Sequence, residues 1–261
     1  MNVHGSVRAA VSLAASHGVV CTDPVVLKAA SNVLVHLRPA PVVARIAGRT
    51  ALMRPSVASH FARDLAVSTF LAQRGVPVVM PSDELPAGPH THDGFVVSFS
   101  TFVPHDPDTR LPRHDVLKLL PALHAELRHY DGPLPVRGPL DDLENTLTYL
   151  GDLSVPLEPL QAQFAELRSR WNLLDVQPLH GDAHHGNVMV TPSGPVWNDF
   201  EDTWRGPIAW DLACAIGPND EGAAQRAVET YGGGATPSDV EFHLELRSFF
   251  ATLWGVFKEH S

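Results

Sequence analysis

The stretch LHGDAHHGNVMV, residues 179–190, places three histidines, one aspartate and one asparagine in a polar segment that runs into an apolar strand. Zinc binds His and Asp side chains, but it usually takes three or four ligands from more than one segment. His184 and His185 are neighbours, whose side chains point apart in an extended or turning loop. A zinc site is therefore one interpretation of the cluster. A second interpretation is that the histidines only cap turns, and for His184 and His185 we favour this one.

A third interpretation rests on spacing. His180, Asp182 and Asn187 fit the pattern H-x-D-x-x-x-x-N of the protein kinase catalytic loop, with a glycine where those enzymes carry arginine. A predicted hairpin follows, and WNDFED (197–202) then places Asp199 where a kinase has the aspartate of its metal-binding turn. This order of loop, strand, turn, strand and aspartate is the one needed to bring Asn187 and Asp199 to the same magnesium ions.

Three motifs resemble the aminoglycoside phosphotransferase family, whose members share the kinase-like fold: HGDAHHGNVMV (180–190), NDFED (198–202) and GPIAWDLA (206–213). The resemblance covers nearly the whole chain in layout, but its specific motifs lie within residues 180–213. Because the family includes choline, homoserine-type and sugar kinases and antibiotic-inactivating enzymes, it implies ATP-dependent phosphorylation of a small-molecule hydroxyl. It does not select the hydroxyl.

The chemistry assigns roles to these residues. Phosphoryl transfer passes through a loose transition state with charge on the phosphate oxygens, so the protein supplies positioning, magnesium and cationic groups. We expect Asp182 to accept the proton of the substrate hydroxyl, and His180 to brace the catalytic loop. Asn187 and Asp199 offer the hard oxygen ligands that Mg²⁺ prefers. By the resemblance, Asp211 holds the catalytic loop.

The nucleotide end departs from the kinase pattern. Kinases pair a strand lysine with a helix glutamate, whereas this sequence offers Arg45 in PVVARI and Asp64 in FARDLAV, each of which could also be a surface charge. A glycine-rich phosphate loop is missing from the sequence, and Ser31 in the turn 29–32 is the hydrogen-bond donor expected in its place. The adenine is expected beside Phe102 and Val103, which could equally be core.

The net charge and the positions of acidic residues indicate which class of substrate the protein could bind. The formal net charge of −10 and the lack of a Lys/Arg cluster argue against nucleic-acid and membrane partners, and they leave a cationic small molecule open. Glu201 and Asp202 directly follow the expected metal-binding aspartate, so they are our candidates for gripping such an acceptor. Trp204 and Trp210 are candidates for stacking on it.

The elements that must position these residues follow from hydrophobic periodicity. The first part predicts a helix at 6–17, three strands within 25–47, a helix at 59–74 and strands at 76–80 and 95–103. The second part predicts two short strands, NVMV and PVWN, and helices at 113–130, 140–153, 157–171, 221–231 and 238–260. We therefore expect an α+β, protein-kinase-like bilobal fold, with a nucleotide-binding antiparallel sheet lobe at 1–103 and a helical catalytic and substrate lobe at 104–261.

Composition sets the remaining expectations. Two distant cysteines make no metal or disulfide framework, and no apolar run approaches the roughly 20 residues that cross a bilayer. We expect a soluble, cytoplasmic monomer or homodimer that uses ATP and Mg²⁺. Two alternatives remain, a catalytically weak pseudokinase-type nucleotide-binding regulatory protein and a metal-dependent hydrolase. A protein kinase is disfavoured because no A-P-E-type segment follows Asp199.

Overall fold

The computed structural model describes residues 2–172, 175–217 and 222–261, and it divides the chain into two compact units. The first unit consists of Met1–Asp106 and Thr191–Glu201, and the second of Pro107–Val190 and Asp202–Ser261. The segment Thr191–Glu201 therefore belongs to the first unit, although most of the second unit precedes it in sequence.

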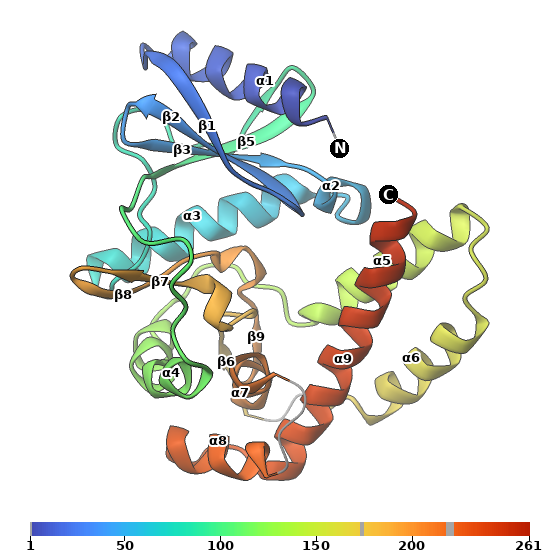
Figure 1. Ribbon diagram of the computed structural model, residues 1–261. Helices are drawn as coiled ribbons and strands as arrows, with labels where there is room; N and C mark the ends of the chain where they lie inside the picture. Colours follow the sequence, from blue (N-terminus) through green and yellow to red (C-terminus); the bar gives the residue numbers. More distant parts are fainter. Residues whose placement is uncertain (1, 173–174, 218–221) are drawn as a thin grey trace. The chain divides into compact units, whose positions relative to one another are not determined.

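The first unit is built on one sheet with the strand order β1-β2-β3-β5-β4, in which all neighbouring strands are antiparallel (Figure 1). Its elements are α1 (Val3–Ser16), β1 (Cys21–Ala29), β2 (Asn32–Pro39), β3 (Val42–Ala47), α2 (Thr50–Met53), α3 (Val57–Gln73), β4 (His90–His92), β5 (Phe95–Thr101) and β8 (Gly194–Trp197). The helices α1 and α3 cover opposite faces of the sheet.

The side chains of β3 alternate between these two faces, as the period of two residues in a strand requires. Ala44 and Ile46 are fully buried in a cluster with Leu13 of α1. Arg45 lies between them in sequence and points the other way, where its guanidinium carbon lies 5.1 Å from the ring centroid of Phe61 on α3. The strand period therefore directs Arg45 toward α3.

The predicted strand 76–80 is wrong. Within this segment Val78 forms only an isolated parallel bridge with Trp197, and the Val79 N–H donates to the Trp197 carbonyl at 2.8 Å. The fifth strand of the sheet is instead β4, which pairs with β5. The pattern misled because an apolar run between prolines indicates a strand, whereas the three residues of β4 carry no apolar signal.

The second unit is mainly helical. It contains α4 (Arg113–Leu127), α5 (Pro139–Asp152), α6 (Glu158–Arg170), β6 (Val176–Pro178), η1 (His185–Asn187), β9 (Arg205–Pro207), α7 (Ile208–Ile216), α8 (Ala223–Tyr231) and α9 (Pro237–Glu259). Strands β6 and β9 form an antiparallel pair. Strand β7 (Val188–Thr191), which pairs with β8, and the 3-10 helix η2 (Phe200–Asp202) lie where the chain passes between the units.

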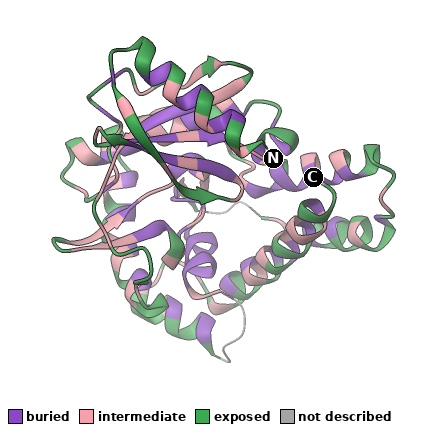
Figure 2. Ribbon diagram, turned by 45° about the horizontal axis from the view of Figure 1, so that its top comes forward, coloured by how far each residue is buried: buried purple, intermediate pink, exposed green. Residues whose placement is uncertain are grey.

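The five helices predicted for this part all occur, as α4, α5, α6, α8 and α9. Residue 221, where one prediction begins, lies outside the described residues. Helix α7 was not predicted as a helix, because eight of its nine residues are buried and it has no polar face to reveal the helical period (Figure 2). Among the described helices, none combines the length and apolar character that crossing a bilayer requires.

Candidate active site

Helix α7 holds residues 180–187, the predicted catalytic loop, through Asp211, whose side chain is fully buried. The backbone N–H groups of His180 and Gly181 donate to the two carboxylate oxygens of Asp211, at 2.8 and 2.9 Å. Trp210, the neighbour of Asp211 on α7, donates from its indole nitrogen to the Gly181 carbonyl at 2.6 Å. The loop is thus fixed by its backbone, which leaves its side chains available for chemistry.

His180 is fully buried and lies within this loop. Its Nδ1 accepts the backbone N–H of Asp182 at 3.3 Å, and its carbonyl accepts the Thr203 hydroxyl at 3.3 Å. These contacts favour the bracing role expected for His180. Gly181 has φ of +90°, and a Cβ placed there would lie 1.9 Å from the Asp202 carbonyl oxygen. This explains why glycine replaces the arginine of the kinase pattern.

The Asp182 carboxylate is surrounded by hydrogen-bond donors of the second unit. The Asn187 amide nitrogen donates to its Oδ2 at 3.1 Å and to its backbone carbonyl at 2.9 Å. His184 Nε2 lies 3.2 Å from the same Oδ2, and Arg247 of α9 donates to Oδ1 at 2.8 Å. Burial alone would raise the pKa of Asp182, but Arg247 and His184 hold it well below its usual range.

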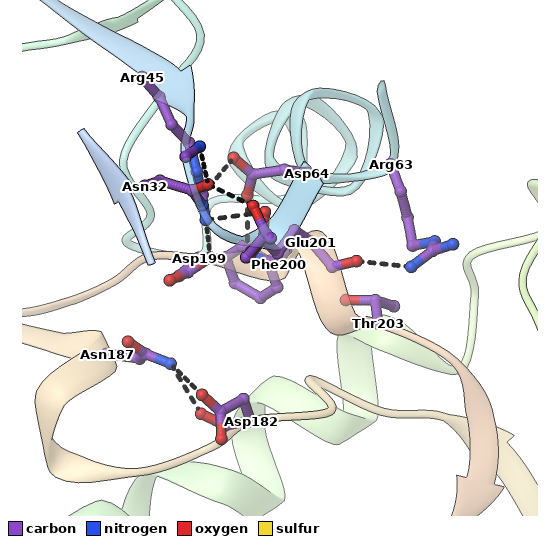
Figure 3. A network of polar contacts seen from close by, with 12 residues as sticks. Asn32, Arg45, Arg63, Asp64, Asp182, Asn187, Asp199, Phe200, Glu201 and Thr203 are labelled. Atoms are coloured by element: carbon purple, nitrogen blue, oxygen red, sulfur yellow. Dashed lines mark hydrogen bonds and ion pairs between the residues drawn. The ribbon is translucent and has the colours of Figure 1, made fainter. Parts of the chain in front are cut away.

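Arg45 forms the centre of a polar network in the first unit (Figure 3). Its guanidinium lies 2.8 Å from Asp199, 2.8 Å from Glu201 and 3.5 Å from Asp64. Burial lowers the pKa of Arg45, but these three carboxylates, Asp199 first, raise it above its usual value. The expected juxtaposition of Arg45 and Asp64 is present, and the arginine also reaches the aspartate expected to bind metal.

Asp199 adopts the left-handed backbone conformation, with φ of 69°, which is uncommon for residues other than glycine. Asp64 on α3 stabilises this turn, because its Oδ1 accepts the Phe200 N–H at 2.7 Å. The Asp199 side chain remains 31% exposed. Strained backbone held by neighbouring contacts is typical of functional positions, so the conformation favours a working role for Asp199.

Glu201 has a different environment from the one expected of a substrate ligand. Its side chain is only 7% exposed, and its carboxylate is held by Arg45 and, at 3.1 Å, by Arg54. Its carbonyl accepts a hydrogen bond from Arg63 at 2.5 Å. We therefore do not retain Glu201 as a substrate ligand. Asp202 belongs to the second unit and is half-buried, with its carbonyl packed against Gly181.

The remaining nucleotide candidates lie in the first unit with local contacts. The Ser31 carbonyl, in the β1–β2 turn, accepts the Thr50 N–H at 3.4 Å. The Phe102 ring stacks on His36 with a centroid distance of 3.8 Å, and its N–H donates to the Pro41 carbonyl at 2.8 Å. The Phe102 N–H is thus already used within the unit. The Val103 carbonyl accepts the His105 ring N–H at 2.8 Å.

The histidine cluster does not assemble a zinc site in the structure. In the part of the chain that the structure describes, no three His, Cys, Asp or Glu side chains are arranged to hold a metal ion. His184 Nδ1 accepts the Gly186 N–H at 2.8 Å, which is the turn-capping role favoured from the sequence. Burial, then Arg113, lowers the pKa of His185.

Sequence reasoning missed two arginines, Arg54 and Arg247. Arg247 lies 65 residues after Asp182, inside a helix whose period shows only an apolar face. Arg54 ends the short helix α2 and is only 6% exposed. A buried arginine needs a carboxylate partner, but sequence alone did not identify which of 29 acidic residues supplies it.

The fold and this site define a small-molecule O-phosphotransferase with an α+β, kinase-like fold. The model of the phosphotransferase enzyme family matches residues 14–243, and the chain belongs to that family. A search of curated protein sequences gives no match.

Solved structures with the same fold have low sequence identity to this chain. An aminoglycoside-3′-phosphotransferase of type VIII is 20% identical, with a TM-score of 0.64, and the match covers 95% of this chain and 100% of that one. A choline kinase from Streptococcus pneumoniae is 13% identical, with a TM-score of 0.68 and coverage of 97% and 90%. A spectinomycin phosphotransferase, solved with ADP and its antibiotic, is 13% identical, with a TM-score of 0.60 and coverage of 93% and 84%.

Proposed function

We propose that this enzyme transfers the γ-phosphoryl group of ATP, in a Mg²⁺-dependent reaction, to a hydroxyl group of a small molecule. The observation that carries this proposal is the placement of Asp182 beside Asn187 on a loop whose backbone is anchored to Asp211. Nucleotide use by related structures supports it, because the spectinomycin phosphotransferase holds ADP and an amicoumacin kinase holds AMP-PNP.

Asp182 is the proton acceptor in this reaction. The substrate oxygen bonds to the γ-phosphorus while the bond from that phosphorus to the β–γ bridging oxygen breaks, and ADP leaves. The hydroxyl proton passes to the Asp182 carboxylate, which also orients the oxygen. A low pKa suits this positioning role, because Asp182 then stays ionised while the loose transition state forms.

The residues that would hold magnesium have suitable chemistry. The Asn187 amide nitrogen faces Asp182, so its carbonyl oxygen is the atom that can serve as a ligand. Asp199 supplies a partly exposed carboxylate from a left-handed turn. Both are the hard oxygen donors that Mg²⁺ prefers. The bound ion would offset charge on the phosphate oxygens.

Arg45 is the cationic group proposed for the nucleotide phosphates. A guanidinium has five N–H donors in a fork that suits phosphate, and Asp64, Asp199 and Glu201 orient it here. Ser31, Phe102 and Val103 remain proposed nucleotide contacts, with Phe102 acting through its ring or carbonyl because its N–H is bonded to Pro41.

Two variants test the assignment. Asp182→Asn should abolish phosphoryl transfer but leave ATP affinity nearly unchanged, since the amide keeps the shape and loses the proton acceptor. Asp199→Ala should also lose the Mg²⁺-dependent part of ATP affinity, measured by calorimetry with and without the ion. Full transfer activity in either variant would refute the assignment. ATP binding without transfer to any acceptor in the parent enzyme would instead indicate the pseudokinase-type regulatory alternative.

A further inference from the structure

The proton acceptor of the proposed reaction has a fixed arginine beside it. Arg247 donates from one terminal nitrogen to Asp182 Oδ1 at 2.8 Å, and its guanidinium carbon lies 5.5 Å from the ring centroid of Trp210. His243, one turn earlier on α9, also contacts the Trp210 ring, with a centroid distance of 6.1 Å. The guanidinium is therefore held in place by α7 and by the carboxylate together.

Most N–H donors of the Arg247 guanidinium are not used by Asp182. A guanidinium carries five N–H groups, and among the described residues Arg247 makes one hydrogen bond, the one to Asp182. Its side chain is 27% exposed, so the rest of the fork is not sealed inside the unit. Carboxylates and phosphates are the groups that match such a fork, since they accept two parallel hydrogen bonds.

The geometry limits where the partner of Arg247 can lie on a substrate. A carboxylate oxygen accepts two hydrogen bonds, and Arg247 occupies one of them on Oδ1. His184 and Asn187 already share Oδ2, so the reacting hydroxyl is best placed on the second lone pair of Oδ1. At a hydrogen-bond length of about 2.7 Å, that hydroxyl oxygen then lies within about 5.5 Å of Arg247.

Near this point the Asp182 carboxylate is already paired with Arg247, and further cations of the second unit act on the catalytic loop. Arg113 and Arg110 both act on His185, the residue that follows His184 in the catalytic loop. The buried Asp211 carboxylate already accepts hydrogen bonds from the loop N–H groups, and His124 Nε2 lies 2.9 Å from it. An ammonium group placed against the Arg247 guanidinium would meet like charge, whereas an anion placed there would meet N–H donors that Asp182 does not use.

We infer that Arg247 is a substrate-binding residue that recognises a carboxylate or phosphate group close to the hydroxyl that is phosphorylated. This inference rests on the proposed function, and it names the acceptor class as hydroxylated anions rather than cationic amino alcohols or aminoglycosides. Arg247 also orients Asp182 through the same guanidinium, so recognition of the acceptor and placement of the proton acceptor share one side chain.

The test uses acceptors matched in carbon skeleton: glycerate, glycerol and 3-aminopropane-1,2-diol, followed by a wider panel of such acid, neutral and amine sets that includes phosphorylated diols. Phosphoryl transfer is followed by ³¹P NMR and by ADP release. In any matched set that the enzyme phosphorylates, kcat/KM for the acid or phosphate member should exceed that for the amine member by at least tenfold. Carboxylate and phosphate members within the panel distinguish the two anions.

Variants of Arg247 supply the decisive comparison. Arg247→Gln should raise KM for the anionic acceptor tenfold or more and remove the charge preference, while Arg247→Lys should restore part of it. The control is Arg170→Gln, which removes an exposed arginine of α6 that pairs with Glu245 of α9 and should leave the preference intact. Circular dichroism melting curves identify folded variants, and Arg247→Lys keeps the test valid if the glutamine variant does not fold.

Three results would overturn the inference. In the first, the parent enzyme has a higher kcat/KM for the amine members than for the acids. In the second, Arg247→Gln lowers kcat/KM equally for anionic and neutral acceptors, which would assign Arg247 to positioning Asp182 alone. In both cases transfer still occurs, so the proposed function stands. No transfer to any acceptor, with ATP binding retained, overturns the proposed function and this inference with it.

Discussion

Gly181 shows how one residue type can be dictated by the backbone around it. It lies between His180 and Asp182, the proposed proton acceptor, and its φ of +90° is strained for any L side chain. The neighbouring atom is a backbone carbonyl, that of Asp202, which cannot swing aside as a flexible side chain can. The loop therefore combines an unusual conformation with a close backbone approach.

Gly181→Ala should destabilise the protein by about 3 kcal/mol or more, because strain and overlap with a backbone atom add. Gly232→Ala is the matched control: its φ of +97° imposes similar strain, but nothing lies within 4 Å of the added Cβ. We expect the control to cost about 1–2 kcal/mol. Urea unfolding measures both values, and equal losses would show that the Asp202 carbonyl moves away easily.

Individual site residues differ in how readily the sequence reveals them. Asp182 and Asn187 lie five residues apart in one loop, so their spacing was enough to bring them together. The approach of Arg45 to Asp64 was predicted by comparison with the strand lysine and helix glutamate that kinases pair. Glu201 was predicted to bind the acceptor because it follows Asp199 in the motif, and nothing in the sequence indicated that Arg45 and Arg54 pair with its carboxylate.

At the scale of elements, α7 is the support on which the catalytic loop rests. The Asp211 carboxylate accepts two loop N–H groups and lies 2.9 Å from His124 Nε2 of α4. His124 Nδ1 in turn lies 2.9 Å from the hydroxyl of Tyr231 at the end of α8. Three helices are thus joined to the loop by one chain of buried and partly buried polar contacts.

Asp211→Asn should therefore damage both folding and catalysis. An asparagine has one acceptor oxygen for donors that now use two, and its own N–H₂ group would face a buried donor, so we expect a loss of about 2–4 kcal/mol. The kcat should fall as the loop loses its anchor. Asp239→Asn is the control, because that carboxylate caps α9 at an exposed site. A stability loss no larger than the control's would contradict the role of α7.

Helices were predicted correctly where one face is buried and the other exposed, because the sequence then shows the helical period of apolar residues. The amphipathic helices α4, α5, α6, α8 and α9 each expose one face, so their period was visible. Helix α7 is enclosed on all sides, and β4 is three polar residues recruited by pairing with β5. Neither carries a local signal, because tertiary contacts rather than intrinsic preference stabilise them.

At the scale of the whole molecule, the first unit depends on a distant part of the chain. Thr191–Glu201 supplies Asp199 and Glu201, the partners of Arg45, to a sheet formed by the first hundred residues. A buried arginine without its carboxylates is strongly destabilising, by about 3–5 kcal/mol for one broken pair. The sequence predicted the order of sheet and helices, but not that this segment belongs to the first unit.

A fragment of residues 1–106 should accordingly lack a cooperative unfolding transition. The fragment keeps all five sheet strands but leaves Arg45 and Arg54 without Asp199 and Glu201. Thermal melting followed by circular dichroism tests this, with the full chain as the reference. A sharp transition in the fragment would show that the sheet and its two packed helices are sufficient without Thr191–Glu201.

Because the first unit is discontinuous in sequence, it cannot be completed early during synthesis on the ribosome. On a ribosome the N-terminal sheet emerges early, but the last segment of the first unit is translated only after α4, α5 and α6 of the second unit. Until residue 201 has left the exit tunnel, Arg45 lacks two of the three carboxylates that pair with it, Asp199 and Glu201. Synthesis of this enzyme therefore contains an obligatory delay, during which a chaperone or a slow translation rate would have the greatest effect on yield.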